Sequence, residues 1–398
     1  MSRPDPEWGH AIEMADVSGT VAVVGAAEPV QSRSSGRTAE EIAVEAARRA
    51  LDDAGLQPRD IDGIMCSRAD GQLDAAAFYR AFATSHDVWE SFDGGPGVIP
   101  FPAAANALRN GDARYILNTY GVAWATRRPE MVGGPGDAHA QESFKQNLEM
   151  PFGWFPQPVY FATVARRHMH DYGTSEDHLG VVAVATRHNA NATPSAIMHD
   201  SPLSLDEYRA SALIAAPFRK EDCCLVSDGG GAYVMTSPER ARDLPHPVVE
   251  LAGVAHAEWT TGWHFAQQRA FTSTPQVFAA PLAFGMAGLV PGDVDVYSCY
   301  DAFTILTIMQ LEDSGFCEKG AGGEFAASAG LEFDTGDLPT NTHGGLLSHA
   351  YVNGIAHVVE IVRQLRGTAS AQVPGAAIAG YGSFTGGGAG TLLLRRAA

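Results

Sequence analysis

The chain contains two stretches that resemble each other, and this internal repeat limits the possible fold more than any other feature. "ALDDAGLQPRDIDGIMCSR" (50–68) aligns without gaps on "AFGMAGLVPGDVDVYSCYD" (283–301), with Ala, Ala-Gly-Leu, Pro, Asp, Asp and Cys at equal spacing. A second pair follows in the same order, because residues 108–121 and 365–382 share a Leu-Arg start and a Tyr-Gly end. Such self-similarity marks duplicated structural units. The sequence therefore predicts two similar halves.

Both halves predict alternating strands and helices. In the first half, residues 21–27 and 61–66 read as buried strands, and Thr38 with Glu41 predicts a capping box on a helix that ends near Gly55. In the second half, strands are expected at 248–254, 294–299, 376–381 and 391–394, and an amphipathic helix at 355–365. Alternating elements of this kind predict an α/β fold of stacked layers with mixed sheets.

Four segments are expected along the chain. They are a first half over 18–125, an inserted loop region over 126–221, a strand of the first half that returns over 222–240, and a second half over 246–398. The insertion contains "PFGWFPQP" (151–158), which is rich in turn-forming and aromatic residues. Long excursions of this kind commonly build or cover binding sites.

Composition and charge exclude several classes of partner. A formal net charge of -19 repels nucleic acid and anionic membranes, and no apolar run is long enough to span a bilayer. Five cysteines without a CxxC pair, and an N-terminus without a signal stretch, indicate a reducing cytoplasm. An anionic small ligand would need a local cluster of arginines.

Three loops of the second half are expected to meet at one end of the strands: "YSCYDAFT" (297–304), "NTHGGLLSHAYVNG" (341–354) and "GYGSFTGGGAG" (380–390). Their glycines allow backbone amides to approach an oxygen that carries negative charge, which would make an oxyanion site. The run 386–388 could equally form only a tight turn between two core strands. Tyr351 raises a separate question, because a phenol is a poor base at neutral pH.

These motifs resemble the thiolase superfamily, and most of all its sterol-carrier-protein-type branch. "DCCLVSDGGGAYVMTS" (222–237), "YDAFT", "NTHGGLLSHAY" and the glycine-rich C-terminal strands fall in that family's order. Tyr300 and Tyr351 stand at the two histidines of the family, Phe384 stands at its late cysteine, and residues 91–111 contain no cysteine. Thiolysis needs an acyl-cysteine and a base that activates it. The chain is therefore not expected to be an ordinary thiolase, and its own cysteines read as small buried residues.

A branch with this altered pattern is known among the aldolases that shorten steroid side chains. The resemblance implies retro-aldol cleavage of a β-hydroxyacyl-CoA to a ketone or aldehyde and a shortened acyl-CoA, with no cofactor beyond the coenzyme A of the substrate. It implies a homodimer and a small partner with an OB fold and a zinc ribbon. The expected catalytic residues are Tyr351, Tyr300, His343 and Asp301, and the expected substrate-binding residues are Trp259, Asn341, Gly344, Gly345, Gly387 and Arg166.

The residues themselves argue against two other aldolase mechanisms. A Schiff base needs a buried lysine of lowered pKa, but Lys145, Lys220 and Lys319 each have charged or polar neighbours. A metal site needs clustered ligands, whereas His168 and His170 point to different faces of a helix. The thioester is then the electron sink, and Tyr351 needs help from neighbouring donors or a cation.

Some alternatives remain open at the level of sequence. Trp259 stands near the position where the steroid aldolases have another tyrosine, so either Tyr300 takes over its role or the substrate differs. Trp259, Trp263 and Phe265 would suit a flat steroid, although aromatic clusters are more often core. The chain could also be a silent subunit that binds acyl-CoA or scaffolds a partner, or a thiolase-like enzyme of another acyl-CoA pathway.

Overall fold

The computed structural model describes residues 5, 7–68, 71–127, 145–262, 264, 267–384 and 386–397. Ten strands form one mixed sheet in the order β10-β11-β12-β9-β2-β8-β5-β3-β4, with β1 added beside β9. The strands of this sheet are β1 Gly9–Ala11, β2 Ala22–Ala27, β3 Gly63–Met65, β4 Trp89–Ser91, β5 Ile116–Ala123, β8 Asp228–Thr236, β9 Val249–Trp259, β10 Val296–Cys299, β11 Ile378–Phe384 and β12 Gly388–Arg396. The separate hairpin joins β6 Leu213–Ala215 to β7 Phe218–Arg219.

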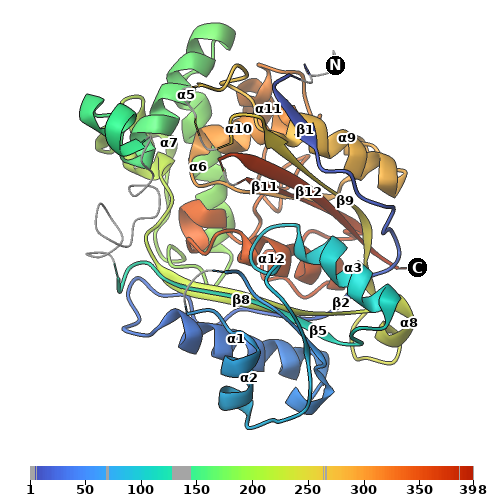
Figure 1. Cartoon of the computed structure of the whole chain (residues 1–398). Coiled ribbons are helices and arrows are strands. Elements are labelled where there is room, and N and C mark those ends of the chain that lie inside the picture. Colours follow the sequence, from blue (N-terminus) through green and yellow to red (C-terminus); the bar gives the residue numbers. More distant parts are fainter. Residues whose placement is uncertain are drawn as a thin grey trace.

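Helices cover the sheet and fill the space between its two halves (Figure 1). They are α1 Ala39–Ala54, α2 Ala75–Phe82, α3 Pro100–Asn110, α5 Gln157–Tyr172, α6 Glu176–Asn191, α7 Leu205–Ala210, α8 Pro238–Ala241, α9 Gln276–Ala287, α10 Thr304–Asp313, α11 Gly322–Ala329 and α12 Ile355–Arg366. No helix in these described ranges is both long and apolar enough to cross a membrane.

The strand order confirms the predicted duplication. From the middle of the sheet outward, the first half runs β2-β8-β5-β3 and the second half runs β9-β12-β11-β10, so the same chain order is repeated. The halves join where Ala22 and Val23 of β2 pair with Glu250 and Val249 of β9. The predicted α/β fold of two similar halves is therefore correct.

The central layer is the helix α12, which packs between the two halves of the sheet (Figure 1). A side chain at Gly231 of β8 would meet Ile355 of α12, whereas one at Gly230 would meet Ile42 of α1. Since neighbouring residues of a strand face opposite sides, α12 and α1 lie on opposite faces of the first half. Helix α9 covers the outer face of the second half, so helices and strands alternate in layers.

The two repeats also share one close contact. Gly55 and Gly288 end α1 and α9 with left-handed φ values of 70° and 66°. A Cβ at Gly25 of β2 would overlap the carbonyl oxygen of Ala50 in α1, and a Cβ at Gly253 of β9 would overlap that of Ala283 in α9. Ala50 and Ala283 are the first residues of the matched stretches, so each half needs glycine where its first strand crosses its first helix.

We expect Gly25→Ala and Gly253→Ala each to lower the free energy of unfolding by about 1–3 kcal/mol, because a methyl group forces strand and helix apart. Chemical denaturation followed by circular dichroism measures this. Gly285→Ala is the matched control, since it lies exposed on α9 with no atom near its Cβ, and alanine should stabilise the helix by up to about 1 kcal/mol. Equal stability of all three variants would contradict the packing argument.

Candidate active site

Tyr300 lies directly after the end of β10 and is held there through its backbone. Its N–H donates to the carbonyl oxygen of Gly382 at 2.9 Å, and its carbonyl oxygen accepts from Nε2 of Gln310 at 2.8 Å. The side chain of Asn341 fixes the preceding residue, because it accepts from the N–H of Cys299 at 2.8 Å and donates to the Cys299 carbonyl oxygen at 3.1 Å. Asn341 thus positions the strand end that carries Tyr300.

The glycine pair predicted to line the site forms a tight turn around Asp301. Gly344 and Gly345 have φ values of 106° and 56°, which favour glycine, and the short helical turn Gly345–His349 follows. Asp301 is fully buried and accepts from the N–H groups of Leu346 and Leu347 at 2.7 and 3.4 Å. A Cβ at Gly345 would overlap this carboxylate. Asp301 therefore anchors the turn to the residue after Tyr300.

This anchoring brings the two predicted tyrosines together. The N–H of Tyr351 donates to Oγ of Ser227 at 2.8 Å, which places the ring at the start of β8. The hydroxyls of Tyr300 and Tyr351 lie 3.1 Å apart, and among the described residues neither has another hydrogen-bond partner. Two phenols from separate loops thus form one hydrogen-bonded pair.

The protonation of this pair follows from its burial. Burial raises the pKa of Tyr300 well above its usual range, and the neighbouring Tyr351 raises it further. Burial also raises the pKa of Tyr351, but a hydrogen bond from Tyr300 acts in the opposite direction. At rest both phenols are protonated, and Tyr351 is the one whose phenolate the pair stabilises.

Cys224 and Trp124 also lie at the tyrosine pair, although no sequence motif predicts their position there. The N–H of Cys224 donates to the carbonyl oxygen of Ala302 at 2.9 Å, and its thiol lies near both phenols. Burial raises the pKa of this thiol, so it is a neutral group and not an activated nucleophile. The ring of Trp124 stacks on Tyr351, with centroids 6.1 Å apart.

His343 lies in a buried histidine cluster and makes no described contact with either phenol. Its ring meets those of His349 at 5.0 Å and His357 at 4.9 Å. Burial and the two neighbouring imidazoles lower the pKa of His343 well below its usual value, so it is neutral. His349 contacts Glu28 at 2.8 Å. Among the described residues, neither His343 nor His349 forms a hydrogen bond with Tyr351 that could assist it as predicted. A catalytic role of His343 stays a prediction.

The role of the predicted substrate-binding residues stays a prediction, and several of them have contacts within the fold. The N–H of Trp259 donates to the carbonyl oxygen of Gly387 at 2.9 Å, but its ring is buried against Phe278 of α9, centroids 6.0 Å apart, as a core ring would be. The N–H of Gly344 already donates to the carbonyl oxygen of Asn341 at 2.8 Å. Arg166 is exposed on α5. Trp263 and Phe265 lie outside the described residues.

Lysine and metal chemistry find no support in the described residues. Burial alone would lower the pKa of Lys319, but Asp313 and Glu312, each 3.0 Å from its Nζ, raise it overall, so its amine stays charged. No group of three potential ligands that could hold a metal ion occurs in the described ranges. His168 is buried against Glu312 at 3.0 Å, whereas His170 is exposed, so the two point apart as predicted.

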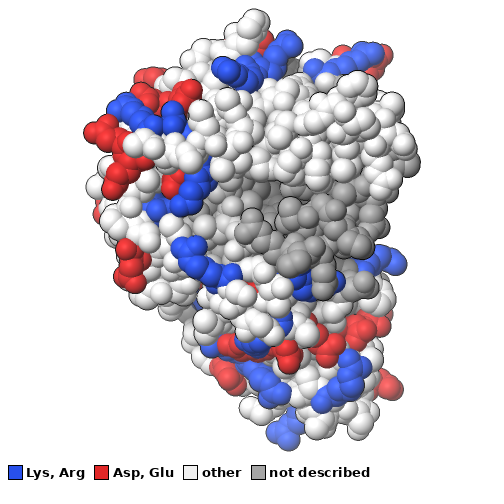
Figure 2. Space-filling view, turned by 90° about the vertical axis from the view of Figure 1, so that its left-hand side faces the viewer, with Lys and Arg blue, Asp and Glu red and all other residues white. Residues whose placement is uncertain are grey.

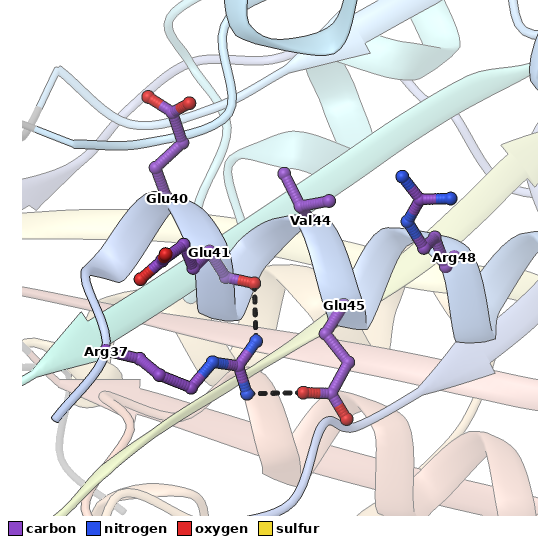
Figure 3. A pocket seen from close by; sticks show the side chains of 6 residues that line it. All are labelled: Arg37, Glu40, Glu41, Val44, Glu45 and Arg48. Carbon is purple, nitrogen blue, oxygen red and sulfur yellow. Dashed lines mark hydrogen bonds and ion pairs between the residues drawn. The ribbon is translucent and has the colours of Figure 1, made fainter. Parts of the chain in front are cut away.

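A surface hollow on the outer face of α1 is a poor candidate for the site (Figure 3). It is lined by Arg37, Glu40, Glu41, Val44, Glu45 and Arg48. Its charges are satisfied locally, because Arg37 binds Glu45 at 2.5 Å and the carbonyl oxygen of Glu41 at 2.7 Å (Figure 3). Among the described residues, the tyrosine pair is therefore the stronger candidate for the site.

Known proteins are similar to this chain both in sequence and in fold. The family described as "Thiolase C-terminal domain-like" matches residues 257–393. The chain is 33% identical over 380 residues to the "Steroid side-chain-cleaving aldolase" of Thermomonospora curvata, with 91% of this chain and 94% of the relative aligned. It is 33% identical over 377 residues to the "17-hydroxy-3-oxo-4-pregnene-20-carboxyl-CoA lyase" of Mycobacterium tuberculosis, with 90% and 95% aligned.

A solved structure agrees with these relatives. The "Ltp2-ChsH2(DUF35) aldolase" superposes with a TM-score of 0.86 at 31% identity, covering 96% of this chain and 99% of that chain. The chain therefore belongs to the thiolase superfamily. Within it, the chain belongs to the branch of the steroid side-chain-cleaving aldolases, and it is a carbon–carbon lyase that works by retro-aldol cleavage.

We expect no covalent acyl-enzyme, because the cysteine thiol at the tyrosine pair has a raised pKa and residues 91–111 contain none. Intact mass measurement after incubation with acetyl-CoA should show the unmodified chain. A stoichiometric acetyl adduct on Cys224, or on any other cysteine, would contradict the aldolase account.

Proposed function

We propose that the substrate is a steroid side-chain CoA thioester with a hydroxyl group on its β-carbon. The products would be a steroid ketone or aldehyde and a shortened acyl-CoA such as propionyl-CoA or acetyl-CoA. The observation that carries this proposal is the hydroxyl contact of 3.1 Å between Tyr300 and Tyr351, at positions where thiolases use histidines. The names of the two relatives, a steroid aldolase and a pregnene-carboxyl-CoA lyase, support the steroid.

The tyrosine pair would perform the proton transfers. The Tyr351 phenolate, stabilised by the Tyr300 hydroxyl, accepts the proton of the β-hydroxyl group. The electrons of that O–H bond form the carbonyl of the leaving ketone, and the electrons of the Cα–Cβ bond move into the thioester as an enolate. Tyr351 then returns the proton to Cα, so the base is regenerated and no electrons are gained or lost.

No cofactor is needed for this reaction, because the thioester of the substrate is itself the electron sink. Coenzyme A is strongly anionic, and the acidic chain must bind it at local cations. Figure 2 shows basic and acidic side chains side by side toward the margins of one face. Arg166 has no ion-pair partner among the described residues, whereas Arg167 pairs with Asp171 at 2.6 Å, so we keep Arg166 as the candidate phosphate contact.

The assembly is also a proposal. The solved relative bears the name of two components, "Ltp2-ChsH2(DUF35)", which supports a small acyl-CoA-binding partner for this chain. Strand β4 is an edge strand that pairs only with β3 among the described strands, and Phe92 beside it is exposed. An open edge of this kind suits a second copy of the chain.

Tyr351→Phe should lower the rate of cleavage by about 10²-fold or more, because it removes the general base and keeps the ring. Single-turnover cleavage of a β-hydroxyacyl-CoA measures this. Tyr233→Phe is the matched control, since the Tyr233 hydroxyl is fully buried and has no hydrogen-bond partner among the described residues, and its loss should leave the rate unchanged. A Tyr351→Phe enzyme within threefold of the parent would end the proposed mechanism.

The rate should rise with pH because the active base is a phenolate. The pKa of Tyr351 lies above its ordinary value, so below it each pH unit increases the phenolate fraction about tenfold. We expect kcat/KM to increase by up to tenfold per unit between about pH 7 and 9. A profile that is flat, or that peaks near neutral pH, would point to another base.

The purified chain should be a dimer in light scattering, and its activity should increase when the small partner protein is added. The open β4 edge is the physical reason to expect the first result. A monomer with full activity and no second protein would contradict both parts of the proposed assembly.

A further inference from the structure

The thioester enolate formed by cleavage needs hydrogen-bond donors, and three N–H groups of the glycine-rich turn already have acceptors of their own. The N–H groups of Leu346 and Leu347 are directed at Asp301, and the N–H of Gly344 is bonded to the carbonyl oxygen of Asn341. In the proposed mechanism, Tyr300 and Tyr351 already take part in the transfer of the hydroxyl proton. A developing oxyanion left without a donor would be costly in a buried site. A donor other than these three N–H groups is therefore needed.

Tyr120 on β5 is a third phenol beside the pair, and its hydroxyl proton is unused. The side chain is only 7% exposed, and its oxygen accepts from Nδ2 of Asn353 at 2.7 Å. Among the described residues, the Tyr120 hydroxyl donates to no acceptor. Burial raises the pKa of Tyr120, so the proton stays on the oxygen. A hydroxyl that accepts one hydrogen bond is also a better donor for another.

The position of Tyr120 links it to Tyr351. Asn353 lies two residues beyond Tyr351 and has a φ of 56°, so one turn connects the amide to the catalytic ring. Trp124 comes directly after the end of β5, four residues beyond Tyr120, and its ring stacks on Tyr351. Tyr120 also lies near enough to Tyr351 to influence its titration. The end of β5 in the first half thus lies against the turn of the second half that carries Tyr351.

The carboxylate of Asp228 holds the segment directly after β5 in place. Asp228 at the start of β8 accepts from the N–H groups of Ala125 and Thr126 at 2.8 and 3.0 Å, directly after Trp124. It also accepts from the N–H of Ser35 at 2.7 Å. One carboxylate therefore fixes three segments that are distant in the sequence. A hydrogen-bond donor on a segment fixed in this way, such as Tyr120, needs little reorganisation when negative charge develops on the substrate.

We propose that Tyr120 donates its hydroxyl proton in a hydrogen bond to the thioester oxygen and so stabilises the enolate, with Asn353 holding the phenol in place. The inference rests on the proposed function. The Tyr120 proton is not transferred: the oxyanion accepts a hydrogen bond while the Cα–Cβ electron pair enters the thioester, and the bond weakens again when Cα is protonated. Tyr351, assisted by Tyr300, moves the proton from the β-hydroxyl group to Cα, and Tyr120 stabilises the charge on the thioester oxygen.

Two variants test this assignment. Tyr120→Phe removes the donor and keeps the ring, and kcat should fall by about 10²-fold, the scale of losing one oxyanion donor. Asn353→Asp replaces the amide by a carboxylate that would accept the Tyr120 proton, so a similar loss is expected, and Asp tolerates the left-handed backbone. In both variants kcat/KM should still rise with pH, because the base is intact, whereas Tyr351→Phe should lose that rise.

The controls separate the possible failures. Thermal denaturation checks that each variant is folded, and Tyr233→Phe serves again as the control tyrosine. If the parent cleaves the substrate and both variants stay within threefold of it, Tyr120 is not the donor and the inference is overturned while the proposed function stands. A parent that cleaves no β-hydroxyacyl-CoA, with its partner added, overturns the proposed function and the inference together.

Discussion

The site depends on the buried carboxylate of Asp301. It accepts from Leu346 and Leu347 across a gap in the sequence of about 45 residues, and it does so only because Gly345 has no side chain. The same residue follows Tyr300 directly, so these two hydrogen bonds fix the distance between the end of β10 and the turn that leads to Tyr351. Hydrogen bonds to a charged group contribute about 1.5–3 kcal/mol each when buried. These hydrogen bonds thereby help to bring the hydroxyls of Tyr300 and Tyr351 within hydrogen-bonding distance.

Much of the fold could be read from the sequence because the two halves repeat the same local signals. Gly55 and Gly288 stop equivalent helices, and Gly25 and Gly253 permit equivalent strand–helix crossings. The repeat also predicted which strand follows which helix. It did not predict that the halves share one sheet through β2 and β9, since pairing between distant strand edges leaves no local pattern.

The site was only partly predictable, and the reason is physical. Tyr300 and Tyr351 stand in motifs whose spacing identifies them, so the pair was expected. Tyr120 lies in β5, Trp124 comes directly after that strand and Cys224 precedes β8, and only tertiary packing brings them to the phenols. The reverse holds for His343: its motif suggested chemistry, but its ring is buried among His349 and His357, near a carboxylate on Glu28. Burial alone would raise the pKa of Glu28, but the interactions with His349 and Arg363 lower it overall. The contacts of Glu28 with His349 and Arg363 thus connect the first half to the second half.

The proposed mechanism divides two roles that thiolases combine in a cysteine and two histidines. In this proposal a phenol pair handles the hydroxyl proton, and the thioester accepts the electrons of the broken carbon–carbon bond. The most direct test is cleavage of a β-hydroxyacyl-CoA in D₂O without free coenzyme A, followed by mass spectrometry of the acyl-CoA released. We expect a ketone or aldehyde and an acyl-CoA in equal amounts, with one non-exchangeable deuterium at Cα of the acyl-CoA. Cleavage that requires added coenzyme A, or an acyl-CoA product without deuterium, would contradict the enolate and with it the retro-aldol mechanism.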